Sequence, residues 1–285
     1  MAGGRMGGYA SRILDIGGVR TAVEWAAAEG WNPGLHDADA FAAADTTGFR
    51  GAWWGDELVA TISAVRYGAE LGFIGFYIVS PHWRGRGIGY RLWGEAMASL
   101  ADVPTVGLDA VVEQQEAYAR SGFVRAFSSF RHGGVLEGRA SARARSVTGA
   151  VRDALVAHDR QHFPAGRRAF LEAWWSLPDS HTRFIAVEGA VVASGTIRRC
   201  RDGWKVGPLF ADSPGLAEEL LDDLVACAGG RARVFLDAPE PNGAAGRLAA
   251  ERGMEVVFET GRMYRGPDPG LPLPRIFGVT SFELG

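Results

Sequence analysis

A short run of arginines and glycines, SPHWRGRGIG at residues 80–89, is the part of the sequence best suited to bind an anion. Glycine lets the backbone approach a ligand closely, and arginine donates forked, charge-assisted hydrogen bonds to phosphate oxygens. The run follows an apolar segment, LGFIGFYIV at 71–79, and precedes an amphipathic segment that begins at Ile88. Because the N-terminus of a helix attracts anions, this arrangement predicts a phosphate cradle.

The spacing of the loop residues separates the known kinds of phosphate-binding loop. A P-loop ends in Gly-Lys-Ser or Gly-Lys-Thr, and this loop contains no lysine. The dinucleotide spacing G-x-G-x-x-G would place its third glycine at Tyr90, and Pro81 separates the glycines from the strand. Asp109 stands where a ribose ligand is expected, but Asp237 repeats it in a part of the chain without such a loop. We therefore expect Asp109 to be structural. The alternatives to a phosphate-binding loop of another kind are a solvated turn and a dinucleotide-binding loop.

Hydrophobic periodicity predicts the elements that hold the loop. Residues 71–79 are expected to form a buried strand, and Ile88, Leu92, Ala96 and Leu100 form one apolar stripe of a helix. The other elements expected in this half are strands at Arg12–Ile16, 49–54, 58–67, 105–111 and 123–130, and helices at Val19–Glu29, 36–44 and 114–121, with turns at Gly55–Asp56 and Gly122.

The second half of the chain repeats this order, which indicates a duplicated domain. WGDELVATISAVRY matches VEGAVVASGTIRRC, GLDA at 107–110 matches FLDA at 235–238, and SGFVRAF matches RGMEVVF. Between the copies, GGVLEGRASARARS is small, polar and charged, which is typical of a linker. We predict an N-terminal domain at 1–136, a linker at 137–146 and a C-terminal domain at 147–285.

The two copies differ at the loop. In the second copy the strand runs through ADSPG at 211–215 into a helix, with Ser213 as the predicted N-cap and Pro214 at the first helical position. Asp212, Glu218 and Glu219 surround this shorter loop, and their charges would repel a phosphate. We therefore expect an anion site in the first copy alone.

The loop and the order of elements resemble the GNAT N-acetyltransferase superfamily. Its acyl-CoA signature, (Gln/Arg)-x-x-Gly-x-(Gly/Ala), is similar to the stretch that contains Arg84, Gly87 and Gly89, and AYARSGF at 117–123 agrees with it. EGWNPG, EQQEAY and the tail RIFGVTSFELG resemble a bacterial subgroup of tandem GNAT proteins with a degenerate second domain. The resemblance implies an α/β fold of two tandem domains, each a mostly antiparallel mixed sheet that is splayed at the CoA site and flanked by helices.

The resemblance also implies roles for individual residues. The main chain of Tyr77, Ile78 and Val79 would pair with the pantetheine arm of acetyl-CoA, although core packing alone also explains their apolar side chains. Tyr118 stands four residues before Gly122, where GNAT sequences carry the tyrosine that faces the thioester sulfur; a core tyrosine is the alternative. The second copy has Ala249 at that position. The residues that would surround the pyrophosphate are Arg84, Gly85, Arg86, Gly87, Ile88, Gly89 and Tyr90.

The general base and the acceptor are not determined by the sequence. The strand at 71–79 contains no acid, and a water chain or one of four more distant groups could serve instead: Glu70, Glu113, Asp37 or His82. Four tryptophans could frame a cationic or aromatic acceptor or fill the core: Trp25, Trp31, Trp53 and Trp54. We expect the second domain to form one wall of the acceptor cleft, because pockets are frequent at domain junctions.

The composition limits the possible partners. A net charge of −3 over 285 residues disfavours a broad nucleic-acid or anionic-membrane surface. Cys200 and Cys227 have no disulfide or zinc-ligand spacing, the apolar run at 71–79 is too short to cross a bilayer, and the Gly-rich start, expected to be disordered, has no apolar leader. We expect a cytoplasmic N-acetyltransferase without a metal that transfers an acetyl group from acetyl-CoA to a small amine. A non-catalytic, CoA-responsive module of the same fold is the alternative.

Overall fold

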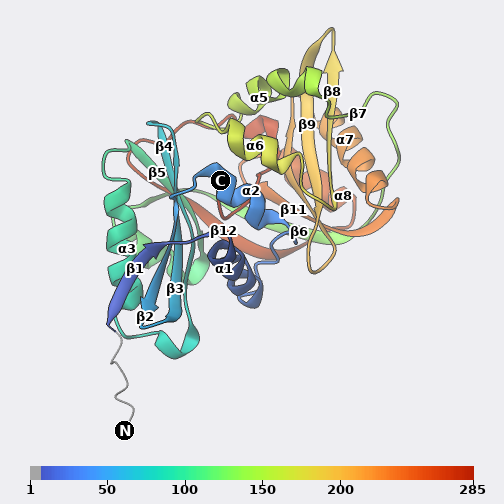
Figure 1. Ribbon diagram of the computed structural model, residues 1–285. Coiled ribbons are helices and arrows are strands. Elements are labelled where there is room, and N and C mark those ends of the chain that lie inside the picture. Colours follow the sequence, from blue (N-terminus) through green and yellow to red (C-terminus); the bar gives the residue numbers. More distant parts are fainter. Residues whose placement is uncertain (1–7) are drawn as a thin grey trace.

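The computed structural model describes residues 8–285, so the Gly-rich start expected to be disordered lies mostly outside the described residues. The chain forms two α/β halves that share one sheet (Figure 1). The N-terminal half contains β1 (Tyr9–Ile13), α1 (Ile16–Ala28), α2 (Asp37–Ala44), β2 (Phe49–Trp54), β3 (Glu57–Tyr67), β4 (Leu71–Val79), α3 (Ile88–Ser99), β5 (Thr105–Val111), α4 (Gln115–Arg120) and β6 (Val124–Glu137).

The C-terminal half repeats this order. It contains β7 (Arg145–Ser146), α5 (Arg152–Arg160), α6 (Arg168–Trp174), β8 (Ser180–Val187), β9 (Ala190–Arg199), β10 (Trp204–Ala211), α7 (Pro214–Cys227), β11 (Arg231–Pro239), α8 (Gly243–Glu251), β12 (Glu255–Arg265) and β13 (Ile276–Gly278). The expected fold class, a mixed sheet flanked by helices in two tandem copies, is confirmed.

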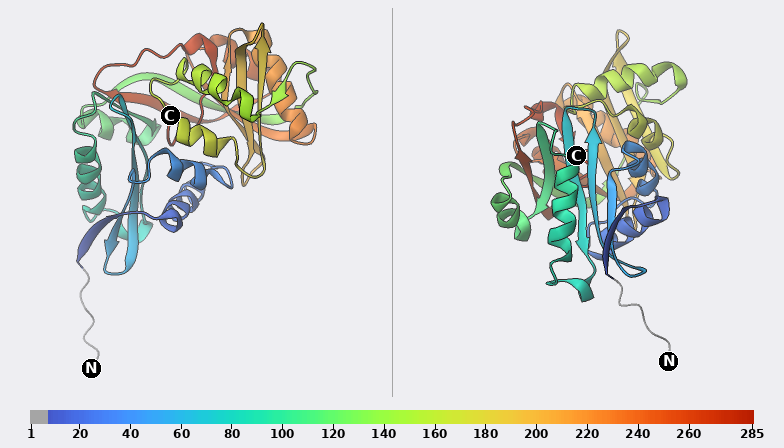
Figure 2. Two further views of the ribbon diagram at one scale, coloured as in Figure 1. Left: turned by 45° about the horizontal axis from the view of Figure 1, so that its top comes forward. Right: turned by 60° about the vertical axis from the view of Figure 1, so that its left-hand side comes forward.

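The halves exchange their long final strands. The order of strands in the sheet is β1-β2-β3-β4-β5-β12-β6-β11-β10-β9-β8-β7, with β13 beside β10. Strand β12 of the C-terminal half therefore pairs with β5, and β6 of the N-terminal half pairs with β11. The two exchanged strands also pair with each other in the middle of the molecule. Figure 2 shows them crossing between the halves.

Two buried ion pairs hold the exchanged strands in matching positions. Arg262 on β12 lies opposite Asp109 on β5 and donates two hydrogen bonds to its carboxylate, of 2.9 and 2.7 Å. Arg131 on β6 lies opposite Asp237 on β11 and does the same, at 2.7 and 2.8 Å. A bidentate pair of this kind holds the two strands in register and also compensates the buried charge of the carboxylate. The expectation that Asp109 and Asp237 are shared structural residues is confirmed.

Most predicted boundaries agree with the structure, and some do not. The first strand spans Tyr9–Ile13 rather than Arg12–Ile16, and the helix after it begins at Ile16 rather than Val19, because Asp15 caps that helix by accepting a hydrogen bond from the Gly18 amide. Residues 133–137 belong to β6 and not to a linker. Gly133 and Gly134 look like turn residues in the sequence, but a Cβ atom at either position would contact Phe235 or Met254, so both serve close packing. The predicted linker at 137–146 thus shares Glu137 with β6, and its other residues and the domain limits stay predictions.

Three apolar clusters join the helices to the faces of the sheet. Helices α1, α2 and α6 share one core with β3 and β4, so the second half packs directly on the first. Helix α3 covers the opposite face, and α7 and α8 form the core of the C-terminal half. Within residues 8–285, no helix is both long and apolar enough to cross a membrane.

Candidate functional site

A cleft opens where β4 and β5 separate. The two strands pair in parallel only from Leu71–Thr105 to Ile74–Leu108. Beyond this point Phe76 has a φ of +48°, in the left-handed region that a phenylalanine rarely adopts, and the register between β3 and β4 shifts. This bulge directs the last part of β4 away from β5, so the edge of Tyr77–Val79 that would face β5 pairs with no other strand in the described part of the chain.

Two adjoining pockets make up this cleft, and they share Trp31, Tyr77, Val111, Gln114 and Tyr118. The outer pocket, near the loop, is also lined by Glu29, Ile78, Val79 and Arg84. The inner pocket is also lined by Ile74, Gly75, Phe76, Leu108, Asp109, Phe258, Thr260, Phe282 and Glu283.

The loop after β4 has the backbone that an anion site requires. Gly85 and Gly87 have φ angles of +74° and +77°, and no atom lies within 4 Å of the position that a Cβ atom would take at either residue. Gly87 is the N-cap of α3 and offers no side-chain hydrogen bond, so the first N–H groups of this 12-residue helix have no side-chain cap. Uncapped N–H groups beside an open glycine loop attract an oxyanion.

The two arginines of the loop are already ordered. Arg84 donates from Nε to the carbonyl oxygen of Val79 over 2.9 Å, and its guanidinium forms an ion pair with Glu29 at the end of α1. The Arg86 guanidinium lies over the ring of Trp83, 4.8 Å from its centroid. The structure therefore places Arg84 in the cleft and Arg86 on the exposed side of the loop.

The remaining predicted loop residues differ in what they can contribute. Gly89 is buried, and a Cβ atom there would lie 2.8 Å from the Tyr77 hydroxyl and the Val79 side chain, so this glycine allows α3 to pack on β4. The side chain of Ile88 belongs to the core beneath α3. Tyr90 is 82% exposed. Ile88 and Tyr90 could thus serve a ligand only through their backbone N–H groups.

Tyr118 lines both the inner and the outer pocket. Its ring packs against the ring of Trp93, with 5.3 Å between the ring centroids, and Trp93 packs against Tyr77 with a centroid separation of 5.5 Å. Its hydroxyl forms no hydrogen bond of 3.5 Å or less within residues 8–285, and the residue lines both pockets. Burial, and to a lesser degree the neighbouring Tyr77, raise the pKa of Tyr118, which keeps the hydroxyl protonated and able to donate at neutral pH.

The predicted bases do not reach the cleft. Asp37 is buried in an ion pair with Arg198, and Glu70 forms an exposed ion pair with Arg160. Glu113 and His82 are exposed. None of these four groups lines either pocket.

The predicted tryptophans divide between core and site. Trp31 lines both pockets, whereas Trp25 and Trp53 pack against the core and Trp54 packs against Trp83 with the two rings tilted. The sequence missed Phe258, Phe282 and Glu283, which come from the C-terminal half and line the inner pocket. Phe282 and Glu283 lie in the tail RIFGVTSFELG, which the sequence analysis singled out without assigning it a place in the site, and Phe258 had no local motif.

The matching opening in the C-terminal half is closed by the chain itself. Strands β10 and β11 pair only over Trp204–Val206 and Val234–Leu236. Beyond this point β13 pairs with β10 at Leu209 and Phe210, and the Val279 amide donates to the Asp237 carbonyl on β11. The backbone edge that is free in β4 is therefore occupied in β10.

The loop and tyrosine of the first half are also replaced in the second. Ser213 caps α7 by accepting a hydrogen bond from the Leu216 amide, as predicted. Ala249 is structurally equivalent to Tyr118, because the amide five residues after each donates to its carbonyl, at 3.0 and 3.1 Å respectively. The uncapped glycine loop, the free strand edge and the tyrosine are thus together in the N-terminal half, and the described C-terminal half lacks them.

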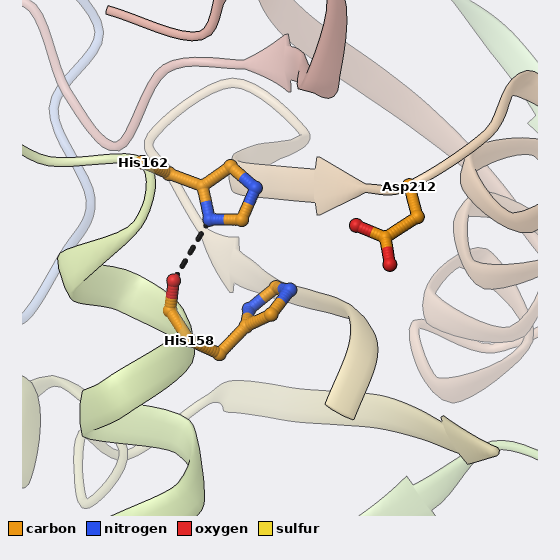
Figure 3. A group of neighbouring side chains, drawn as sticks. All are labelled: His158, His162 and Asp212. Carbon is orange, nitrogen blue, oxygen red and sulfur yellow. Dashed lines mark hydrogen bonds between the residues drawn. The ribbon is translucent and has the colours of Figure 1, made fainter. Parts of the chain in front are cut away.

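A cluster of His158, His162 and Asp212 lies beside the second loop (Figure 3). Their nearest ligand-type atoms are within 4.8 Å of one another, and the Nε2 atoms of both histidines have no partner among the described residues. Arg275 forms an ion pair with Asp212, however, and its positive charge would oppose a cation at the same place. Burial lowers the pKa of His158 to about 3, so this histidine is neutral at physiological pH.

A splayed sheet, an open glycine loop at an uncapped helix and a tyrosine across the cleft define an acyltransferase of the GNAT class. Family models agree: residues 18–123 match the acetyltransferase (GNAT) family, and residues 155–278 match an acetyltransferase (GNAT) domain. The chain is 33% identical over 264 residues to holothin acyltransferase of Pseudoalteromonas sp. (strain SANK 73390), covering 92% of this chain and 90% of that protein. The chain therefore belongs to the GNAT family of acyltransferases, with two GNAT domains in tandem.

Solved structures show the same fold over nearly the whole chain. A putative acetyltransferase from Pyrococcus horikoshii superposes with a TM-score of 0.80 at 22% identity, covering 98% of this chain and 96% of that chain. A tandem GNAT protein from the clavulanic acid biosynthesis pathway superposes with a TM-score of 0.59 at 15% identity, covering 92% and 100%. The tandem arrangement is thus found in other proteins of this fold.

Proposed function

We propose that the protein transfers an acetyl group from acetyl-CoA to a small amine, and that the reaction takes place in the N-terminal half. The observation that carries this proposal is the β4–β5 cleft, in which a free strand edge, an uncapped helix N-terminus and the Tyr118 hydroxyl meet. A reducing cytoplasm, in which Cys200 and Cys227 stay as free thiols, is the location that we propose.

The residues of the cleft fit acetyl-CoA. The backbone of Tyr77–Val79 offers unpaired groups to the amide-containing pantetheine arm, and the open space at Gly85 and Gly87 leaves room for phosphates. Arg84 adds a positive charge on the same side. When bound, the thioester supplies an acyl group that is activated toward nucleophiles.

Tyr118 would serve the departing sulfur. Its hydroxyl is protonated, unengaged by other described groups and placed where the pockets meet, so it can donate a hydrogen bond as negative charge develops on the thiolate. The inner pocket would hold the acceptor, since it lies beyond Tyr118 from the loop and is lined mainly by apolar and aromatic side chains.

A screen of amines tests this function. Purified protein is mixed with acetyl-CoA and a panel of primary and secondary amines, with holothin included because a relative is named for it. Free thiol release is followed, and the acylated product is confirmed by mass spectrometry. We expect amine-dependent turnover with at least one member. Tight acetyl-CoA binding without turnover of any amine would favour a CoA-responsive binding module.

A further inference from the structure

The C-terminal segment at 279–285 leaves its own half and lies against the strands of the other half. The Tyr67 hydroxyl on β3 donates to the Leu284 carbonyl over 3.0 Å. A Cβ atom at Gly75 on β4 would lie 2.1 Å from the Glu283 carbonyl oxygen, so this close approach requires glycine at position 75. Figures 1 and 2 show this end of the chain between the halves, beside β4.

Groups of the C-terminal half hold the segment in place. Arg167, which is buried and paired with Asp159, donates to the Thr280 hydroxyl over 2.8 Å and to the Gly285 carbonyl over 3.3 Å. The Leu284 amide donates to the Ser281 hydroxyl over 3.1 Å. Because these bonds flank Glu283 on both sides, its position in the inner pocket is fixed by the fold.

Glu283 is a buried acid with no hydrogen-bond or ion-pair partner among the described residues. It is 3% exposed and lines the inner pocket together with Tyr118. Within residues 8–285, its carboxylate takes part in no hydrogen bond of 3.5 Å or less and no ion pair of 4.0 Å or less, whereas Asp109, the other acid of this pocket, is bound by Arg262. A buried charge without a partner is costly, and such groups concentrate at functional sites.

Several charged groups surround Glu283 from the elements packed around it. Asp109 of β5, Arg131 of β6, Arg198 of β9 and Lys205 of β10 all lie close enough for its charge to act on them. Arg131 forms a bidentate ion pair with Asp237, and Arg198 forms an ion pair with Asp37 through a single contact. Lys205 donates to the Trp31 carbonyl over 3.3 Å.

Aromatic side chains surround the acid on the acceptor side. Trp31, Phe76, Phe258 and Phe282 line the same pocket. Aromatic faces attract cations and flat apolar groups, and a carboxylate among them binds an ammonium ion. The pocket therefore suits an amine attached to a flat apolar group.

We propose that Glu283 is the catalytic base of the N-terminal site, so that the segment from the C-terminal half completes the active site of the other half. This inference rests on the proposed function. The carboxylate takes one proton from the ammonium form of the acceptor. The neutral nitrogen then forms its bond to the acyl carbon and releases its second proton to the Tyr118 hydroxyl. The carbon–sulfur bond then breaks, its electron pair leaves with the sulfur, and a proton delivered through the Tyr118 hydroxyl gives free CoA. The products are the amide and the thiol.

The test compares two nucleophiles in Glu283→Gln, using acetyl-CoA as donor. One is the fastest-reacting of the panel amines that are ammonium ions at pH 7, and the other is hydroxylamine, which is mostly neutral at that pH. We expect turnover of the amine to fall by about a hundredfold or more, because general-base catalysis contributes about that much. Turnover of hydroxylamine should change by less than about threefold, and the affinity for acetyl-CoA should be unchanged.

Controls separate a base from a structural group. Glu113→Gln removes an exposed acid beside the cleft and should leave both rates unchanged. Glu283→Asp keeps the carboxylate and should retain more amine turnover than Glu283→Gln, which also covers the case in which the glutamine variant folds poorly. Equal losses with both nucleophiles, or no loss with either, would overturn the role of Glu283 while the proposed function stands. Acetyl-CoA binding with no turnover of any amine by the unmodified protein would overturn both.

Discussion

In each half, two neighbouring parallel strands separate at the same place in the fold, and the two openings differ in what occupies them. Between β4 and β5 the opening is a cleft lined by Tyr118, whereas between β10 and β11 it is filled by β13. The helix that follows is uncapped in the first half and capped by Ser213 in the second. The fold thus provides two equivalent positions for a ligand, and the sequence occupies one of them with its own backbone.

Other features are the same in both halves. Asp109 with Arg262 and Asp237 with Arg131 are equivalent pairs, each joining an exchanged final strand to its neighbour. The same stretch of chain, residues 276–285, closes the opening of its own half and then lines the cleft of the other. The contrast teaches that the scaffold is duplicated while the ligand site is not.

The shared ion pairs give the largest expected effect. Arg262→Met leaves Asp109 buried without a partner, so the free energy of unfolding should fall by about 3–5 kcal/mol. Arg131→Met should have a similar effect on Asp237, since the pairs are equivalent. Urea unfolding followed by circular dichroism measures both. Arg168→Met, which removes an exposed pair with Asp153, serves as the control and should leave stability nearly unchanged. A much smaller loss for Arg262→Met would break the comparison.

Tyr118 tests the part of the site that the second half lacks. If its hydroxyl donates to the sulfur only as charge develops there, Tyr118→Phe should lower turnover by about a hundredfold with acetyl-CoA affinity nearly unchanged. Tyr9→Phe, which removes a hydroxyl bound to Glu95 on the outer side of the sheet, is the matched control. Rates at saturating amine and dissociation constants are compared for both variants. An unchanged rate for Tyr118→Phe would remove this residue from the mechanism.

The two loops can be compared by adding the same side chain near the start of the helix that follows each of them. Gly87→Val imposes a branched side chain on a φ of +77°, and Arg84→Glu reverses a charge in the cleft. Each should weaken acetyl-CoA binding by about tenfold or more, because one charge-assisted contact contributes about 1.5–3 kcal/mol. Gly215→Val lies in open space at the start of α7 and should not affect binding. Calorimetry gives the three affinities, and an effect at Gly215 as large as that at Gly87 would contradict the account.

The buried histidines of the second half give the smallest effect, on the dependence of stability on pH. Burial lowers the pKa of His158 to about 3, while an unfolded chain has a histidine pKa of about 6.5. The unfolded state therefore binds a proton first as the pH falls, so the stabilisation is complete above about pH 6.5 and is lost between that pH and about 3. From pH 7 to 5.5 the free energy of unfolding should fall by about 1 kcal/mol through this group. His158→Gln should remove that part of the slope, and an unaltered slope would contradict it.

Local patterns predicted the loop side of the site well. The end of β4 at Val79 and the start of α3 at Ile88 agree with the periodicity, and Ser213 caps α7 as its residue type suggests. These features depend on residues that are neighbours in the sequence, so spacing and residue type determine them. The family resemblance then indicated the role of Tyr118, which the structure places at the cleft.

The sequence did not reveal the features that depend on distant pairing. Strand exchange of β6 and β12 leaves no local signal, because either strand has the pattern to pair with either neighbour. Strand β13 is too short to show an alternating pattern. Glu283 reaches the inner pocket through a segment fixed by Arg167 and Tyr67, and no spacing rule connects these residues.

The number of acetyl-CoA sites tests the central claim most directly. The whole chain is titrated with acetyl-CoA in a calorimeter, and the stoichiometry is read from the equivalence point. An open β4–β5 cleft and a β10–β11 opening filled by β13 predict one molecule bound per chain, with binding weakened by Arg84→Glu. Two equivalent sites per chain, or one site that Arg84→Glu leaves intact, would contradict the account.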